Sequence, residues 1–138
     1  MMDLANLRQL FSQAGVGFAY LFGSRARGQE GPDSDYDIAV WYVDRELDVY
    51  QRFLRGCDLQ VLLAAELGGK VDLVILNDAQ PVLQNETVLR GKALYPDDPE
   101  AVIRFEARVR QRYEDYSYSQ RFFTEARRAR MGQRDLTA

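Results

Sequence analysis

The sequence predicts an α+β protein in which helices and strands alternate and pack in layers. Two observations predict this class. In several segments apolar residues recur at spacings of three and four, as they do on the buried face of a helix. Between these segments lie short apolar runs of strand length, bounded by Gly, Pro or Asp. The 138 residues, 46% of them apolar, are enough for one domain with a buried core.

Local signals place the boundaries of each element. Gly15 and Gly17 are expected to stop the first helix, and Pro81 suits the first turn of a later one. A segment rich in Gly, Pro and Asp predicts a loop over 28–34. In order, we expect a helix over 3–14, strands over 18–22 and 35–43, a helix from Asp48 to Gly68, a strand over 71–76, a helix from Pro81 to Gly91, a strand over 92–95 and a long helix from Asp98 onward.

The helix that begins at Asp48 carries a capping box, with Gln51 at the reciprocal position. Its buried face is predicted from apolar residues at helical spacing: Val49, Phe53, Cys57, Val61, Ala64 and Ala65. Cys57 is the only cysteine, so it cannot form an intrachain disulfide. We therefore expect a buried structural thiol in a reducing compartment.

The composition excludes several kinds of catalytic site. The chain contains no His, which excludes Ser-His-Asp and Cys-His catalysis, His-ligated zinc and a His general base. A single Cys excludes thiolate zinc sites as well. Any metal must therefore be held by oxygen, and carboxylates together with substrate phosphates suit Mg²⁺.

Charge and hydropathy bear on location and partners. A net charge of −3 gives no general attraction to nucleic acid or to an anionic membrane. No apolar run approaches the roughly 20 residues that span a bilayer. The first residues lack the basic start and apolar core of a signal peptide. We expect a cytoplasmic protein.

Three aspartates and a Gly-Ser pair form the candidate site. Asp35 and Asp37 stand two positions apart at the start of a strand, so their side chains project from one face. Asp72 interrupts another apolar strand, and all three carboxylates converge if the two strands are neighbours. Such a cluster is costly unless a cation fills it. Gly23-Ser24 ends the preceding apolar run, where backbone N–H groups can bind a phosphate.

Two arginines follow the Gly-Ser pair. Arg25 and Arg27 can contribute to a phosphate site beside the carboxylates. They can equally be surface side chains of a first helical turn.

The spacing of these residues resembles that of a known family. Gly23-Ser24, ten intervening residues and then Asp35-x-Asp37 closely resemble the signature of the DNA polymerase β-like nucleotidyltransferase superfamily. The segments 23–28 (GSRARG) and 34–38 (SDYDI) look like its small bacterial branch, the minimal nucleotidyltransferases. Asp72 stands where that family carries its third carboxylate. The resemblance covers roughly residues 4–95.

The resemblance implies a nucleotidyltransferase fold, in which a short mixed sheet is flanked by helices. Residues 1–96 would form its core, and residues 97–138 a helical extension within the same domain. Asp35 and Asp37 would bind two Mg²⁺ ions, while Asp72 would bind one of them and act as, or assist, the base. The reaction would transfer a nucleotidyl group from an NTP such as ATP to an acceptor hydroxyl and release pyrophosphate.

The resemblance also implies a partner. Minimal nucleotidyltransferases often pair with a HEPN-domain ribonuclease as toxin and antitoxin, so the implied activity is transfer of AMP to a tyrosine hydroxyl of the toxin. Two alternatives stay open. One is an antitoxin that neutralises its toxin by binding alone, and the other is a transferase acting on a small molecule, as antibiotic nucleotidyltransferases do.

The last helix combines aromatic and arginine residues. Its apolar side favours core packing for the first half, up to Tyr116. Beyond it, Phe122 and Phe123 among arginines predict a contact with a partner or a second copy, because such residues are enriched at interfaces. Interleaved acids argue against a nucleic-acid surface.

Overall fold

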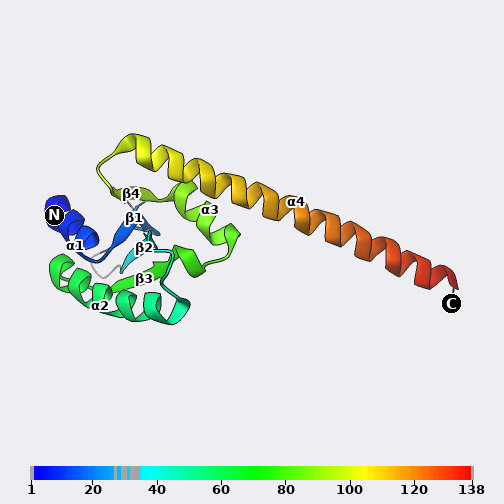
Figure 1. The fold of residues 1–138 in the computed structure, drawn as a ribbon, viewed down its shortest axis with the longest axis horizontal. Coiled ribbons are helices and arrows are strands. Elements are labelled where there is room, and N and C mark those ends of the chain that lie inside the picture. Colours follow the sequence, from blue (N-terminus) through cyan, green and yellow to red (C-terminus); the bar gives the residue numbers. More distant parts are fainter. Residues whose placement is uncertain (1, 27, 29–30, 32–34, 138) are drawn as a thin grey trace.

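The computed structural model describes residues 2–26, 28, 31 and 35–137, and the side chains only as far as residue 132. The described residues form helices and strands that are arranged as Figure 1 shows. They are α1 (Leu4–Gln13), β1 (Val16–Phe22), β2 (Tyr36–Tyr42), α2 (Val49–Leu67), β3 (Val71–Ile75), the short 3₁₀ turn η1 (Leu76–Asp78), α3 (Pro81–Arg90), β4 (Lys92–Tyr95) and α4 (Pro99–Thr137).

The strands form one mixed sheet in the order β3-β2-β1-β4. β1 pairs antiparallel with both β2 and β4, whereas β2 and β3 run parallel. The register sets Phe22 opposite Asp37 and Asp37 opposite Asp72. The sheet therefore brings the end of β1 and the starts of β2 and β3 to one place.

Helices cover both faces of this sheet. α1 and α2 pack on one face over a core that includes Phe11, Ile38 and Leu63. α4, with Val88 of α3, packs on the other face, where Phe105 contacts Tyr20 and stacks on Phe18. Figure 1 shows α2 beneath the sheet and α4 above it. The mixed sheet, the flanking helices and the long last helix confirm the predicted fold class.

The predicted boundaries hold with small shifts. β1 begins at Val16, so Gly17 lies inside the strand and does not contribute to stopping α1. Gly15, whose φ is +76°, makes that turn. Gly17 is needed for another reason, because a Cβ there would collide with Val43. The capping box of Asp48 and Gln51 is present at the start of α2.

The predicted buried face of α2 is wrong. Cys57 is exposed, and the side chains of Val49, Phe53 and Val61 are 61%, 59% and 70% exposed. The face that packs on the sheet instead carries the buried residues Gly56, Leu59 and Leu63. A Cβ on Gly56 would lie 3.0 Å from Ile75, so this glycine lets the helix approach the sheet closely. The helix is apolar on two faces, and the fold buries only one.

α4 has a packed first part and a projecting second part. Phe105 and Val109 are buried, and Tyr113 and Tyr116 are half-buried. From Tyr118 to Gly132 every residue except Ala126 is exposed, and this part leads away from the sheet in Figure 1. No helix in the described part of the chain is long and apolar enough to cross a membrane.

Candidate active site

The structure brings two of the predicted carboxylates directly together. Asp37 and Asp72 are register partners on the parallel strands β2 and β3. In both strands the neighbouring residues pack on the α1 and α2 side, so the aspartates face the side of α3 and α4. Asp35, two residues before Asp37, lies just outside the strand on the same side by alternation.

Gly23 lies against Asp37. Its φ is +75°, and a Cβ built on it would collide with Oδ2 of that aspartate. Only glycine suits both the backbone conformation and this close approach. Gly23 and Ser24 directly follow β1, and Gly23 brings this turn next to Asp37. The Gly-Ser pair and the Asp35-x-Asp37 motif, which are distant in the sequence, thus lie next to each other.

The electrostatics of Asp37 reflect this crowding. Burial raises the pKa of its carboxyl, and the nearby charges of Asp72 and Asp35 raise it further, in that order. The negative charges of two neighbouring carboxylates act on Asp37, which favours a bound cation. Carboxylate oxygens, together with substrate phosphates, are the ligands that Mg²⁺ prefers.

The aspartates do not enclose a metal site by themselves. Among the described residues, no three acidic, His or Cys side chains are gathered closely enough to form a ready-made metal cage. Lys70 Nζ lies 3.6 Å from Asp35 Oδ2, in an exposed pair that contributes little.

Arg25, which follows the Gly-Ser pair, packs on an aromatic ring of β2. The guanidinium of Arg25 lies over the ring of Tyr36, 3.7 Å from its centroid. Tyr36 packs against the core on the α1 and α2 side, opposite to Asp37. The structure thus brings Arg25 to the rim of the site on Tyr36, a residue that sequence analysis passed over. Arg27 lies outside the described residues.

A second contact that the sequence did not indicate fixes α4 to the sheet. The hydroxyl of Tyr20, in the buried centre of β1, donates a hydrogen bond of 2.9 Å to Glu106 Oε1. Burial and this bond raise the Tyr20 pKa well above its ordinary value, so the hydroxyl stays a donor. The available signal was a tyrosine inside an apolar strand, because a buried hydroxyl needs a partner.

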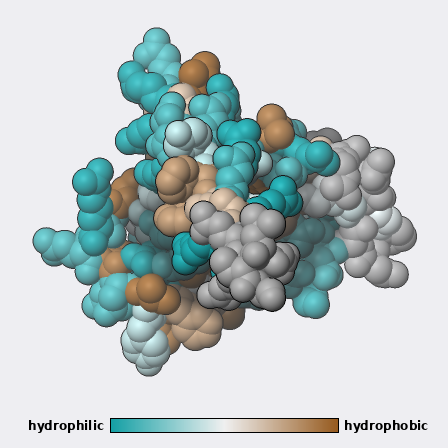
Figure 2. Space-filling view, turned by 90° about the vertical axis from the view of Figure 1, so that its right-hand side faces the viewer, coloured by the Kyte–Doolittle hydropathy of each residue, from teal (hydrophilic) through white to brown (hydrophobic). Residues whose placement is uncertain are grey.

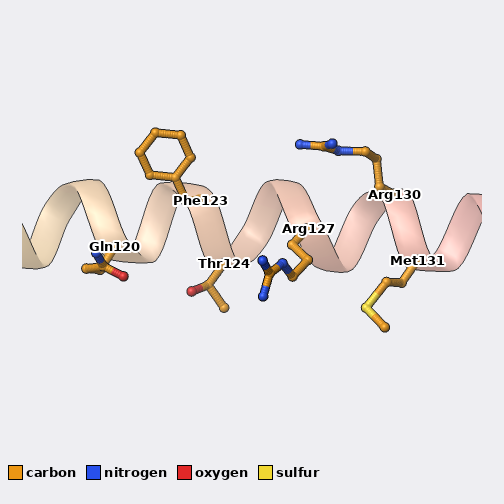
Figure 3. A pocket seen from close by; sticks show the side chains of 6 residues that line it. All are labelled: Gln120, Phe123, Thr124, Arg127, Arg130 and Met131. Carbon is orange, nitrogen blue, oxygen red and sulfur yellow. The ribbon is translucent and has the colours of Figure 1, made fainter.

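The projecting part of α4 carries a separate surface. Six side chains, all from α4 itself, line a hollow along this helix, and Figure 3 shows them on more than one side of it: Gln120, Phe123, Thr124, Arg127, Arg130 and Met131. Phe122 and Phe123 are 59% and 65% exposed and contact each other edge to face. Only α4 lines this hollow among the described residues, so it is an open surface rather than an enclosed cavity.

Comparisons with known proteins agree with this geometry. The model of the family described as Polymerase beta, Nucleotidyltransferase matches residues 5–100. A relative from Shewanella oneidensis, named protein adenylyltransferase MntA, is 42% identical over 76 residues. That match covers 55% of this chain but only about half, 51%, of the relative. A protein of the same name from Aphanizomenon flos-aquae is 28% identical over 119 residues, 77% of each chain.

Solved structures share the whole architecture. One chain of a crystal structure described as a toxin-antitoxin with AMP-PNP superposes with a TM-score of 0.68 at 28% identity, covering 91% of this chain and 98% of that one. A chain from a complex described as tri-AMPylated Shewanella oneidensis HEPN toxin with MNT antitoxin gives 0.62 at 26% identity, covering 89% and 93%.

Proposed function

Because the chain belongs to the Polymerase beta nucleotidyltransferase family, we propose that it transfers AMP from ATP to a hydroxyl of a HEPN-domain toxin and acts as that toxin's antitoxin. The observation that carries this proposal is the placement of Asp37 and Asp72 as register partners beside Gly23. The names of the relatives supply the acceptor class: they are protein adenylyltransferases, and one solved complex holds an AMPylated HEPN toxin. A tyrosine is the acceptor that the sequence resemblance implies.

The Gly-Ser pair, the arginines and Asp72 have separate roles in the proposed reaction. Gly23 and Ser24 bind the polyphosphate through backbone N–H groups and a hydroxyl, and Arg25 and Arg27 are the further phosphate ligands that the sequence offers. The acceptor oxygen attacks the α-phosphorus, the bond from that phosphorus to the bridging oxygen breaks, and pyrophosphate leaves. Asp72, on the edge strand β3 and exposed, takes or helps to take the hydroxyl proton.

Mg²⁺ fits the donor set that the chain offers. Asp35 and Asp37 would hold two ions and Asp72 one of them. When bound, these ions would neutralise charge that develops on the attacking and leaving oxygens. The raised Asp37 pKa supports this assignment, because like charges gathered at the start of two strands are stabilised by a cation.

We assign a separate role to the helical extension, residues 97–138. Residues 1–96 carry the chemistry, and residues 97–138 continue the same domain as a helix whose first part packs on the sheet. We assign the projecting part of α4, with Phe122, Phe123 and Met131, to docking of the toxin. Aromatics and arginines on an exposed helix favour a protein surface as the occupant. Because the reaction consumes ATP, we place it in the cytoplasm.

A transfer assay tests the proposal. The chain is incubated with its toxin, Mg²⁺ and ATP labelled at the α-phosphate, and label is expected on the toxin. Asp35→Asn and Asp37→Asn should each lower the rate by about a thousandfold, and a chelator should abolish transfer. Asp44→Asn is the matched control, because Asp44 follows the other end of β2. Undiminished labelling by both site variants would contradict the assignment.

A second candidate is neutralisation by binding alone. The exposed aromatics of α4 favour it, because they offer a docking surface that needs no chemistry. A variant with both Asp35→Asn and Asp37→Asn separates the two: full protection of cells from the toxin supports binding, and lost protection with unchanged complex formation supports transfer.

A further inference from the structure

We propose that a hollow between α4 and the end of β2 is a second binding site of this chain, and that it takes a free nucleoside phosphate. The hollow has a volume of about 450 Å³, within the range usual for small-molecule sites. It is called the arginine hollow below, because four arginines line it: Arg45, Arg52, Arg108 and Arg112.

Positive charge gathers in the arginine hollow although the chain as a whole is acidic. A single acidic residue, Asp44, lines it beside the four arginines, whereas the whole chain has a net charge of −3. Among the described residues, no ion pair joins Arg45, Arg108 or Arg112 to a carboxylate. Asp44 is engaged in its own turn, where its Oδ1 accepts a hydrogen bond of 3.0 Å from the backbone N–H of Glu46. Three guanidinium groups are therefore available to an anion, and such groups bind phosphate oxygens well.

Two further carboxylates near these arginines already have partners. Asp78 Oδ2 accepts a hydrogen bond of 2.9 Å from Arg52 Nε, so the fourth arginine of the hollow is neutralised by Asp78. Asp115, three residues after Arg112 on α4, accepts a hydrogen bond of 3.1 Å from Gln111 Nε2. The positive charge of the hollow is thus not cancelled by these two acids.

The walls of the arginine hollow are held in place by contacts within the chain. The guanidinium of Arg112 lies over the ring of Trp41, 5.0 Å from its centroid, and this ring meets Phe105 edge to face at 5.5 Å. The side chain of Asn77 exchanges two hydrogen bonds of 2.9 Å with the backbone of Tyr42, which fixes the end of β2. A site that is ordered in advance loses little entropy when a ligand binds.

A second hollow adjoins the first and favours a ligand with a planar ring. It has a volume of about 440 Å³ and shares Phe18 and Arg108 with the arginine hollow. The small side chains of Ala101 and Ala107 and the longer one of Arg104 complete its lining. Nucleobases stack on aromatic rings and on guanidinium planes. A nucleoside phosphate, with a planar base beside several negative charges, matches the two hollows better than a simple anion does.

The arginine hollow is separate from the catalytic carboxylates. Trp41 and Asp37 lie on the same face of β2 but four residues apart, or about 13 Å. Ala39, between them, is fully buried in the core that includes Tyr20 and Phe105. Hydrophilic side chains predominate on the side toward which α4 projects, with a few apolar ones between them (Figure 2). A nucleotide in the hollow therefore leaves the carboxylates free, and the proposal is independent of the transfer reaction.

The fluorescence of Trp41 tests the proposal directly, because this residue lines the hollow and is the only tryptophan of the chain. With EDTA present, ATP should change the fluorescence saturably, with a midpoint below about 1 mM. Inorganic triphosphate, which has the charge without the base, should bind at least about tenfold more weakly. No saturable response to ATP, or equal binding of inorganic triphosphate, would overturn the proposal.

Variants locate the signal. Arg45→Gln with Arg108→Gln should weaken ATP binding by about tenfold or more, because each removes a charged donor from an exposed position. The matched control is Arg110→Gln with Arg128→Gln, which removes two exposed arginines of α4 outside both hollows and should leave the binding unchanged.

The other possible sources of a signal are also distinguished. Asp35→Asn with Asp37→Asn should leave the fluorescence response to ATP intact, and its loss would assign the response to the catalytic site and overturn the proposal. A short single-stranded RNA that binds much more tightly than ATP would overturn it too, because the arginines would then form a nucleic-acid surface. So would fluorescence that responds to the toxin and to no nucleotide, because the hollow would then hold a protein side chain.

Discussion

Asp37 and Asp72 lie opposite each other in the register of the parallel strands β2 and β3, with their side chains on the same face of the sheet. Strand alternation and pairing alone produce this juxtaposition, and no other element has to move to complete it. The site therefore belongs to the most rigid part of the molecule. Preorganised charges of this kind need little rearrangement when the substrate binds.

Asp37→Asn should make the folded protein more stable at neutral pH. The pKa of Asp37 is raised, so its ionised form is less favourable in the folded chain than in the unfolded one. The wild type carries this penalty above its carboxyl pKa and loses it as the pH falls and the group becomes protonated. Urea unfolding at a series of pH values should show a difference between variant and wild type that shrinks toward acid. A difference in the free energy of unfolding that stays constant with pH would contradict this prediction.

Gly23→Ala should disrupt the site. Alanine pays about 1–2 kcal/mol for the left-handed backbone and also collides with Asp37 Oδ2. A displaced carboxylate should cost about a hundredfold in transfer rate. Gly68→Ala is the control: its φ is +67°, and a Cβ there meets no described atom within 4 Å, so it should lower stability without a comparable loss of rate. Equal losses of transfer rate in Gly23→Ala and Gly68→Ala would contradict the role of the close approach between Gly23 and Asp37.

Two buried tyrosines should respond differently to loss of the hydroxyl. Tyr20→Phe removes the bond to Glu106 and should lower the free energy of unfolding by about 2 kcal/mol, because the acceptor is charged. Tyr42→Phe should be neutral or raise it by up to about 1 kcal/mol, because the Tyr42 hydroxyl is buried with no partner in the described chain. Chemical unfolding of both variants makes the comparison, and a greater loss in Tyr42→Phe would contradict it.

The projecting part of α4 should bind the toxin without taking part in the chemistry. The double variant Phe122→Asp with Phe123→Asp should bind the toxin about tenfold to a hundredfold more weakly. Its melting temperature should equal that of the wild type, since neither side chain reaches the core. Titration calorimetry against the toxin measures this, with Ile103→Asp, an exposed residue of the packed part, as control. Unchanged affinity in the first variant would move the docking surface elsewhere.

The elements and the site followed from short-range signals. Glycines, caps and apolar spacing place the helices and strands within a few residues, and the pairing of Asp37 with Asp72 needed only that their two strands be neighbours. The β2–β3 pairing meets that condition. Contacts between layers of the fold were harder to predict, because nothing local in the sequence connects Tyr20 to Glu106, 86 residues away.

The face of α2 shows why periodicity alone was insufficient. Both of its apolar arcs have helical spacing, and the exposed one, which includes Phe53, Cys57 and Val61, is the more regular. The sheet selects the other arc because Gly56 lets the helix approach Ile75 and Leu73 closely. A pattern of apolar residues indicates that a face avoids water, without saying whether the same chain or another one covers it.

The intact mass of the toxin tests the central claim most directly. After incubation with this chain, ATP and Mg²⁺, its mass should rise by one or more AMP groups. Asp37→Asn should leave it unchanged, and the control Asp44→Asn should give the wild-type increase. A toxin that keeps its unmodified mass while the wild-type chain neutralises it completely would contradict nucleotidyl transfer as the function of this site.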